Sequence, residues 1–192
     1  MSIKHGQRGF SLIELILFIV IVSVGVLGLL GVMNLSASRQ GADPLLQKQA
    51  LAIAESLLAE IQRQPFSYCD PDDANATLAQ SAAECTAGLS QDTLAGPIPA
   101  AESRNGASGS PYDHVTDYAR NAGLILNDVS DAGNPPRLTM TGYQATIRLA
   151  WADTRFGLAS GTHAALRIDV AVSNGPANVT LTGYRLRYAP QL

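Results

Sequence analysis

An uninterrupted apolar segment near the N-terminus constrains this 192-residue chain more than any other feature. No residue from Leu15 to Met33 carries a charge. A helix rises about 1.5 Å per residue, so this segment is long enough to cross a hydrocarbon core of about 30 Å. Because lipid offers the backbone no hydrogen-bond partners, the segment is predicted to be a membrane-spanning helix rather than a buried core helix or strand.

The charges before the apolar segment predict its orientation. Lys4 and Arg8 precede it, and positions 1–9 contain no acidic residue. Positive residues stay on the cytoplasmic side, so the N-terminus is expected inside and the rest of the chain outside. A cleaved secretory signal peptide is the alternative, but the residues around Ala37 fit a small-x-small cleavage site poorly.

Glu14 is the one acidic residue at the start of the apolar segment. An ionised carboxylate within hydrocarbon costs at least about 2.5 kcal/mol, and such residues usually have a function. No cation lies within the segment to pair with it. A cut after Gly9 would free an amino group at Phe10, one helical turn away, which could pair with Glu14 in the same chain or in a neighbouring subunit.

The residues Arg8-Gly9-Phe10-Ser11-Leu12-Ile13-Glu14 resemble the type IV prepilin (class III) signal. That signal has a basic residue, Gly, Phe, and then Glu as the fifth residue after the cut. The resemblance implies that a prepilin peptidase cleaves between Gly9 and Phe10 on the cytoplasmic side and N-methylates Phe10. It also implies that the apolar segment is retained in the mature protein.

The composition argues against one class of partner and favours another. The formal net charge is −3, whereas a nucleic-acid-binding protein requires a basic face. We therefore expect no nucleic-acid partner. Charged residues make up only 15% of the chain, so the soluble part is expected to offer neutral surface to neighbouring protein molecules.

The two cysteines, Cys69 and Cys85, lie in the part predicted to be outside the cytoplasm. An oxidising compartment favours a disulfide between them. Two free thiols are the alternative, and no histidine stands at a spacing that would complete a zinc site.

A second helix is predicted after the apolar segment. Asp43-Pro44 is a typical helix start, with Asp as the N-cap and Pro at the first helical position, and Pro65 ends the helix. Its apolar residues recur at helical spacing along one face: Leu46, Ala50, Ile53, Ala54, Leu57, Leu58 and Ile61. In pilin-like proteins such a segment continues the membrane helix, which here would give a stem from Phe10 to Gln64, bent near Gly41.

The last third of the chain is predicted to form an antiparallel meander. Three stretches alternate apolar and polar residues, as expected of strands with one buried face. The apolar positions are Tyr143, Ala145, Ile147, Leu149 and Trp151; Leu166, Ile168, Val170 and Val172; and Tyr184, Leu186 and Tyr188, with Arg185 and Arg187 on the wet face. The alternation of apolar and polar residues shifts by one position at Gly142 and at Gly183, which predicts a β-bulge at each glycine. The stripe on the second helix is expected to cover the buried face.

The predicted fold class is therefore α+β. A long N-terminal helix, membrane-spanning in its first half, packs on a C-terminal antiparallel β-sheet, which by the resemblance is a pilin-like αβ-roll. The expected divisions are a cleaved leader (1–9), the transmembrane and filament-core half of the stem (10–35), its amphipathic half (36–64) and a globular head (65–192). The head comprises a variable loop region (65–137) and the sheet (138–192).

Two clusters of polar residues in the loop region could form binding sites, but we interpret both as ordinary surface. Asp70, Asp72, Asp73 and Asn75 form an acidic cluster whose spacing does not match a calcium loop, so a solvated loop is expected. The run 110–113 resembles a capping box that opens a short helix closed by Gly123. His114, Asp113 and Asp117 are expected on the surface of that helix.

No arrangement of residues predicts catalysis, a cofactor or a metal. The chain is therefore expected to be a structural protein and not an enzyme, and the segment from Gln49 to Ile61 also resembles minor pilins of the MSHA (MshD) and PilV type. The leading hypothesis is a minor pilin of a type IV pilus, with Glu14 setting the register between subunits. The alternatives are a pseudopilin of a type II secretion system and a pilus-tip adhesive subunit that binds through 65–137.

The resemblance also implies partners and a location. The expected partners are other pilin subunits, the prepilin peptidase, the pilus assembly machinery and inner-membrane lipid. The protein is expected in the bacterial inner membrane, with its head in the periplasm, and then in a filament at the cell surface.

Overall fold

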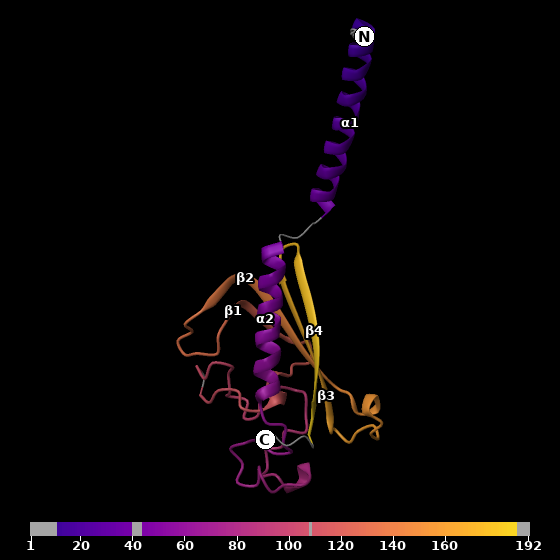
Figure 1. The fold of residues 1–192 in the computed structure, drawn as a ribbon. Helices are drawn as coiled ribbons and strands as arrows, with labels where there is room; N and C mark the ends of the chain where they lie inside the picture. Colours follow the sequence, from indigo (N-terminus) through magenta and orange to yellow (C-terminus); the bar gives the residue numbers. More distant parts are fainter. Residues whose placement is uncertain (1–10, 40–43, 108, 188–192) are drawn as a thin grey trace, which may run out of the picture. The chain divides into compact units, whose positions relative to one another are not determined.

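A computed structural model describes residues 11–39, 44–107 and 109–187 of the chain. The chain divides into two compact units, Met1–Gly41 and Ala42–Leu192. The described part of the first unit is one helix, α1 (Leu12–Arg39), shown in indigo and violet in Figure 1. The predicted leader and the predicted bend near Gly41 lie outside the described residues, so the single stem remains a prediction.

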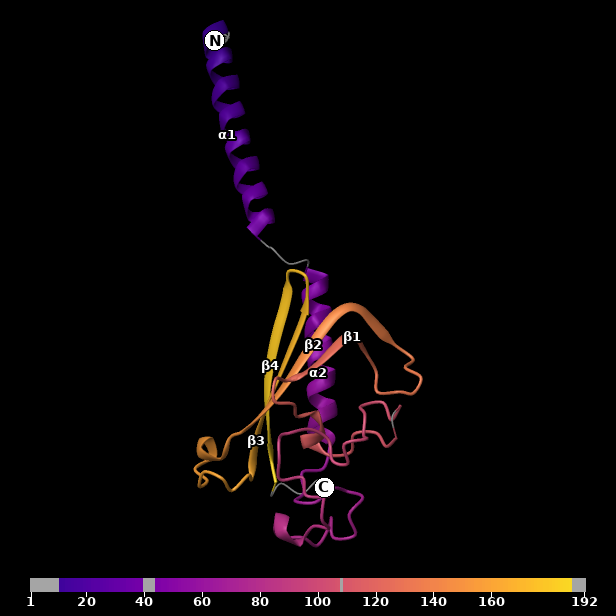
Figure 2. The ribbon, with the colours of Figure 1, turned by 180° about the vertical axis from the view of Figure 1, so that it is seen from behind.

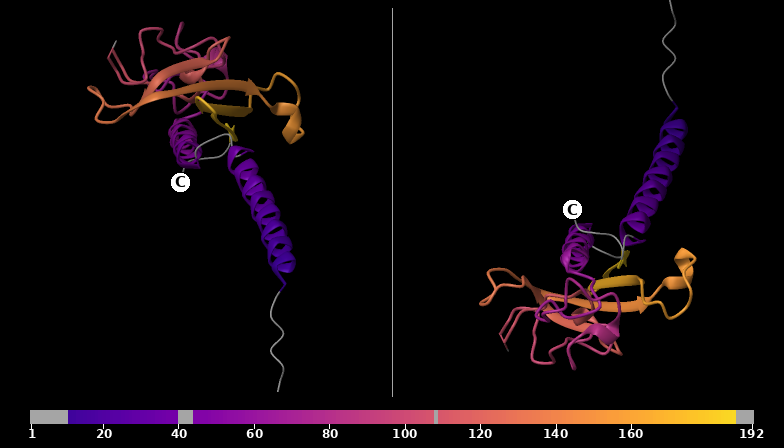
Figure 3. Two further views of the ribbon diagram at one scale, coloured as in Figure 1. Left: turned by 90° about the horizontal axis from the view of Figure 1, so that it is seen from above. Right: turned by 90° about the horizontal axis from the view of Figure 1, so that it is seen from below.

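The second unit is a helix packed on an antiparallel sheet. Helix α2 (Pro44–Arg63) lies along one face of a four-stranded sheet of order β1-β2-β3-β4, as Figures 1 and 2 show from opposite sides. In Figure 3, α2 is seen close to end-on beside the sheet. The strands are β1 (Leu124–Ser130), β2 (Thr139–Trp151), β3 (Ala165–Asn174) and β4 (Ala177–Leu186). The predicted α+β, pilin-like fold class is confirmed.

Three short 3₁₀ helices lie in the connections of the second unit. They are η1 (Ala82–Glu84), η2 (Val115–Tyr118) and η3 (Asp153–Phe156). The first two belong to the long connection from α2 to β1, which otherwise consists of turns and bends.

The apolar stripe of α2 forms one side of the hydrophobic core. Ala50, Ala54, Leu57 and Ile61 are buried, and Leu46, Ile53 and Leu58 are partly buried against the same cluster. Fully burying one Leu or Ile side chain contributes about 1.5–3 kcal/mol. The predicted stripe is confirmed, and the helix ends at Arg63, just before the proline that was expected to end it.

The alternation predicted for β2 and β3 is also confirmed. Tyr143, Ala145 and Ile147 of β2 are buried, and so are the four predicted apolar residues of β3. The pairing of β1 with β2 shifts register at Asp128, opposite Gly142. Gly142 has a φ of +82°, and its N–H donates to Asp128 Oδ1 at 2.8 Å. The predicted irregularity at Gly142 is therefore present.

The sequence analysis missed one strand. β1 falls within 65–137, which was expected to contain loops and one short helix but no strand. Its alternation is broken by Asn127 and Asp128, and Asp128 has a φ of +48°. Because two turn-forming residues interrupt a seven-residue strand, the run of alternating apolar and polar residues is too short to be recognised in the sequence.

For the last strand, the prediction of which side chains are buried was wrong. Gly183 pairs with Ile168 in unbroken register, so there is no bulge there. Arg187 lies over the rings of Phe66 and Tyr68, and its side chain is 3% exposed.

Tyr184 and Arg185 lie on the opposite faces of β4 from those predicted. Tyr184 contacts the ring of Phe156 on the other face, while Arg185 donates to the backbone oxygen of Gln64 in the segment that follows α2. Tyr188 lies outside the described residues.

Gly183 is instead a point of close contact between α2 and β4. A Cβ on this residue would lie 2.6 Å from Gln62 Nε2 and 2.8 Å from Leu58 Cδ1. A real side chain there would have to push both residues of the helix aside, so the glycine permits the helix to pack directly on the strand.

Gly183→Val is expected to lower the free energy of unfolding by about 1–3 kcal/mol, the usual cost of overpacking. Leu58→Ala should remove part of that clash, so the double variant should lose less stability than the two single losses added together. Urea unfolding followed by fluorescence of Trp151, the one tryptophan, measures these values.

Thr180→Val is the control, since Thr180 is exposed on the same strand and should change stability by no more than about 0.5 kcal/mol. Strictly additive losses for Gly183→Val and Leu58→Ala would contradict the assigned contact.

Candidate functional site

Helix α1 has the dimensions of a membrane span. Leu12–Val32 is a 21-residue stretch with a mean hydropathy of 3.0 and none of it buried, and it would extend about 30 Å as a helix. Taken by itself, α1 has no other described element in its unit to cover it. An apolar surface of this extent is stable only against lipid or other protein, so the helix fits a membrane anchor.

Glu14 lies in the first turn of α1 and is exposed. A negative charge in the first turn is favourable because the N-terminal end of a helix carries a partial positive charge. Among the described residues, none forms a hydrogen bond or ion pair with its carboxylate. Gly9 and Phe10, the predicted cleavage and methylation positions, lie outside the described residues, so their roles remain predictions.

Comparison with known families agrees with the N-terminal motif. Residues 4–30 match the family model of the prokaryotic N-terminal methylation motif. The chain therefore carries a type IV pilin-like prepilin signal, which indicates a type IV pilin-like or pseudopilin protein. No curated protein and no solved structure gives a significant match.

The motif also indicates what kind of protein this is. It is typical of structural subunits rather than of an enzyme family, and it implies other pilins and the prepilin peptidase as partners. Together with the apolar helix, it fits anchoring in a membrane and a place in a pilus.

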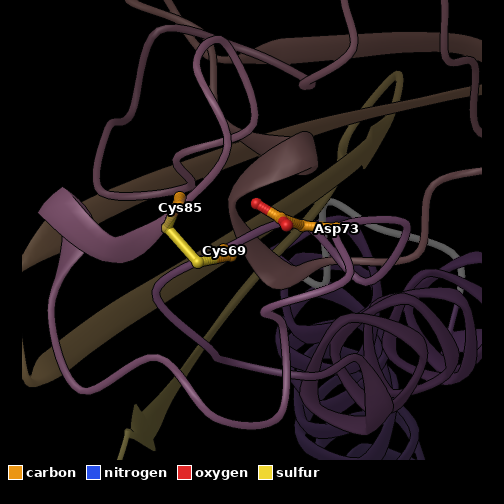
Figure 4. A group of neighbouring side chains, drawn as sticks. All are labelled: Cys69, Asp73 and Cys85. Atoms are coloured by element: carbon orange, nitrogen blue, oxygen red, sulfur yellow. A yellow bond between two sulfur atoms is a disulfide. The ribbon is translucent and has the colours of Figure 1, made fainter.

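In the head, Cys69 and Cys85 are joined by a disulfide with an S–S distance of 2.07 Å, shown in Figure 4 with Asp73 beside it. The Asp73 carboxylate accepts hydrogen bonds from Asn75 N and from Thr86 N and Oγ1. Because both sulfurs are bonded to each other, this group offers no thiolate to a metal. The disulfide thus fixes the start of the loop region.

The segment around His114 differs from its prediction. The 3₁₀ helix η2 begins after His114 rather than at Ser110, and its C-cap is Ala119 rather than Gly123. His114 and Asp117 are fully buried, so the expected surface helix was wrong. Burial lowers the pKa of His114 to about 3, and the ring is therefore neutral.

A buried polar network connects η2 to the disulfide loop. Gln91 Nε2 donates to Asp70 Oδ2 at 2.9 Å and to Asp117 Oδ1 at 3.1 Å. Thr116 Oγ1 donates to Gln91 Oε1 at 2.7 Å, and the backbone N–H of His114 donates to Asp117 Oδ2 at 2.7 Å. Distant segments of the loop region are thus held by hydrogen bonds between buried side chains.

Four carboxylates gather beside this network: Asp70, Asp72, Glu102 and Asp113, each with an oxygen within 4.8 Å of the others. Burial, and then the charges of Asp117 and Asp113, raise the pKa of Glu102 to about 8. Burial, and then the charge of Asp70, raise the pKa of Asp113 to about 6. The sequence analysis placed Asp70 and Asp72 in a solvated loop, and no local signal pointed to Glu102.

Replacing both cysteines, Cys69→Ser with Cys85→Ser, is expected to lower the free energy of unfolding by about 3 kcal/mol. The bond closes a loop with a sequence separation of 16, and closing a loop of about this size restricts the unfolded chain by that amount. Urea unfolding of the oxidised protein and the double variant measures the loss. Equal stability of the two would show that the polar network alone holds the loop.

Proposed function

We propose that this chain is a minor pilin, a structural subunit of a type IV pilus of the MSHA-like kind that acts in pilus assembly. One combination of observations carries the proposal. The methylation motif at 4–30 leads directly into an apolar helix of which nothing is buried, and a helix-on-sheet head follows. A pilin-type subunit requires these three parts in this order.

The N-terminal chemistry follows from the motif. Cleavage between Gly9 and Phe10 removes the basic leader with Lys4 and Arg8 and leaves the apolar helix at the new N-terminus. The freed amino group of Phe10, methylated by the same peptidase, is a cation one helical turn from Glu14.

In the filament, Glu14 pairs with the Phe10 amine of an adjacent subunit. The helices pack against one another in a dry environment, where an unpaired charge is strongly unfavourable. Only those axial positions that bring an amine to each Glu14 satisfy both charges, so the pair sets the register between subunits. The rest of the helix supplies apolar contact area without that selectivity.

The route to the filament passes through the membrane. The exposed apolar surface of α1 is first covered by inner-membrane lipid, with the N-terminus in the cytoplasm and the head in the periplasm. The assembly machinery then transfers the helix from lipid to the filament core, where other subunits replace the lipid. The soluble head has a core of its own between α2 and the sheet, so we expect it to stay folded throughout.

A pseudopilin of a type II secretion system shares the whole N-terminus and is the second candidate. The same motif supports it. The two differ in the assembly that takes up the protein: deletion of the gene impairs surface pili in the first case and protein secretion in the second.

The mature protein is expected to begin with N-methylated Phe10 in cells that contain a prepilin peptidase. Intact-mass and N-terminal peptide mass spectrometry of the membrane fraction measures this. Gly9→Val should leave the leader attached, because the peptidase requires a small residue before the cut. An intact N-terminus in the unmodified protein, or a cut near Ala37, would refute the assignment.

Glu14→Val is expected to be cleaved and methylated normally but to enter filaments poorly. Its abundance in sheared pili should fall about tenfold or more, since leaving the partner amine unpaired in a dry core costs about 3–5 kcal/mol. Glu14→Asp, which keeps the charge, is the matched control and should enter better than Glu14→Val. Immunoblots of sheared pili and membranes measure both, and normal entry of Glu14→Val would remove the register role.

A further inference from the structure

We propose that Asp70, Asp72, Glu102 and Asp113 bind a calcium ion in the head. These residues come from three separate segments of the loop region, and each places a carboxylate oxygen within 4.8 Å of the others. Two oxygens on opposite sides of a calcium ion lie about 4.8 Å apart, because each calcium–oxygen distance is about 2.4 Å. The four oxygens are therefore spaced as ligands of one ion would be.

Glu102 is the residue that requires a ligand. Its side chain belongs to a residue only 6% exposed, and neither carboxylate oxygen has a hydrogen-bond partner. Asp113 Oδ1 is likewise buried without a partner. A buried acceptor left unsatisfied costs about 1–3 kcal/mol. With its pKa raised to about 8, Glu102 can be neutralised by a proton at neutral pH, but its acceptor oxygens still have no partner. A bound cation would satisfy all three buried oxygens at once.

The protein itself supplies no such cation within the described residues. The ion pairs found there join other acids, namely Glu60, Asp92 and Asp169. Arg120, close by in sequence, donates instead to the backbone oxygens of Asp117 and Ala119 and to the hydroxyl of Tyr112. The four carboxylates thus share one small volume without a basic side chain paired to any of them.

The Asp70 carboxylate is held in place by hydrogen bonds from its surroundings. Asp70 Oδ1 accepts from the backbone N–H of Asp72 at 2.9 Å, and Asp70 Oδ2 accepts from Gln91 Nε2 at 2.9 Å. Each oxygen keeps a further lone pair for a metal. Gln91 is itself fully buried and bonded to Thr116, so it orients Asp70 as an outer-shell residue orients a ligand.

The donor set selects a hard cation. All four ligands are carboxylates, which suit calcium and magnesium rather than softer metals. Nitrogen and sulfur are not offered nearby: both ring nitrogens of His114 make hydrogen bonds, to Thr116 and Ser67, and Cys69 is in the disulfide.

Calcium is favoured over magnesium by the number and origin of the ligands. Magnesium demands near-ideal octahedral geometry and usually retains several waters, with only one or two carboxylates. Calcium accepts six to eight oxygens in irregular geometry. Four carboxylates from three separate segments, with the exposed Asp72 open to solvent for added waters, fit calcium.

The ion would act as a structural link within the loop region. Asp70 and Asp72 directly follow Cys69, Glu102 closes a turn by donating its N–H to the Pro99 oxygen, and Asp113 precedes the buried His114. One bound ion would therefore link three separate segments of the connection between α2 and β1. Calcium modules of extracellular proteins bind with a Kd of about 10⁻⁴–10⁻³ M, which is the range expected here.

The test is calcium titration of the full-length protein in detergent micelles after removal of metal with EGTA. Isothermal titration calorimetry with calcium chloride should show one ion per chain with a Kd of about 10⁻⁴–10⁻³ M. The unfolding temperature should rise by about 3–5 °C at a calcium concentration about tenfold above that Kd. Magnesium chloride should bind more weakly.

Asp72→Asn is the most informative variant, because Asp72 is exposed and its replacement leaves the fold intact. Calcium affinity should fall about tenfold or more. Glu102→Gln should also lose binding. Without calcium it should be about as stable as the unmodified protein at neutral pH, because a carboxyl with a pKa of about 8 is largely protonated there and the neutral amide resembles it. Glu55→Gln, the same chemical change at an exposed position of α2, is the control and should bind normally.

Three results would overturn the proposal: no saturable calcium binding by the unmodified protein, affinity unchanged in Asp72→Asn, or magnesium binding as tight as calcium binding. All three readouts concern the head alone. They are independent of cleavage at Gly9 and of entry into a filament. Either the calcium site or the pilin function can therefore be refuted without affecting the other.

Discussion

The rest of this structure depends on the apolar surface of α1, which has no partner among the described residues of its own unit. A helix with 21 residues of mean hydropathy 3.0 cannot remain in water, so lipid or further copies of such a helix must cover it. The head therefore has to fold without help from α1. It does so through α2, whose apolar stripe supplies the layer that the sheet requires, and through Gly183, which lets Leu58 and Gln62 approach the last strand.

The head itself is held together in two different ways. Between α2 and the sheet the stabilising contacts are apolar, whereas the long connection from α2 to β1 is fixed by a disulfide and by polar contacts. Arg104 forms a bidentate pair with Glu60 of α2, and Tyr118 donates to the same carboxylate. This connection contributes Phe66, Tyr112, Val115 and Tyr118 to the core, but much of the rest consists of turns and bends, whose geometry depends on polar groups finding partners. That is why the unpaired Glu102 is informative.

The sequence predicted those parts of the fold that depend on local period. The stripe of α2, the strands β2 and β3 and the end of α2 before Pro65 all follow from spacing, and all were confirmed. Residue spacing cannot predict features that depend on contacts between distant residues. Gly183 was predicted to form a bulge but is a packing contact with α2. Arg187 was expected to be exposed to solvent but lies over the ring of Phe66. The same holds for the burial of His114 and for the grouping of Glu102 with Asp70. Gly9 and Phe10 remain predictions from the motif alone.

Glu14 and Glu102 pose the same physical problem at different stages. Neither carboxylate has a partner among the described residues, and each is proposed to bind a cation that those residues do not supply. Glu14 is exposed, so its need for a cation arises only when α1 enters a dry environment, and its pairing is thereby coupled to assembly. Glu102 is buried by the fold of the head itself, so its need arises as soon as the loop region folds. Under the two proposals, the cation at Glu102 would bind as the head matures, before a neighbouring subunit's amine became available to Glu14.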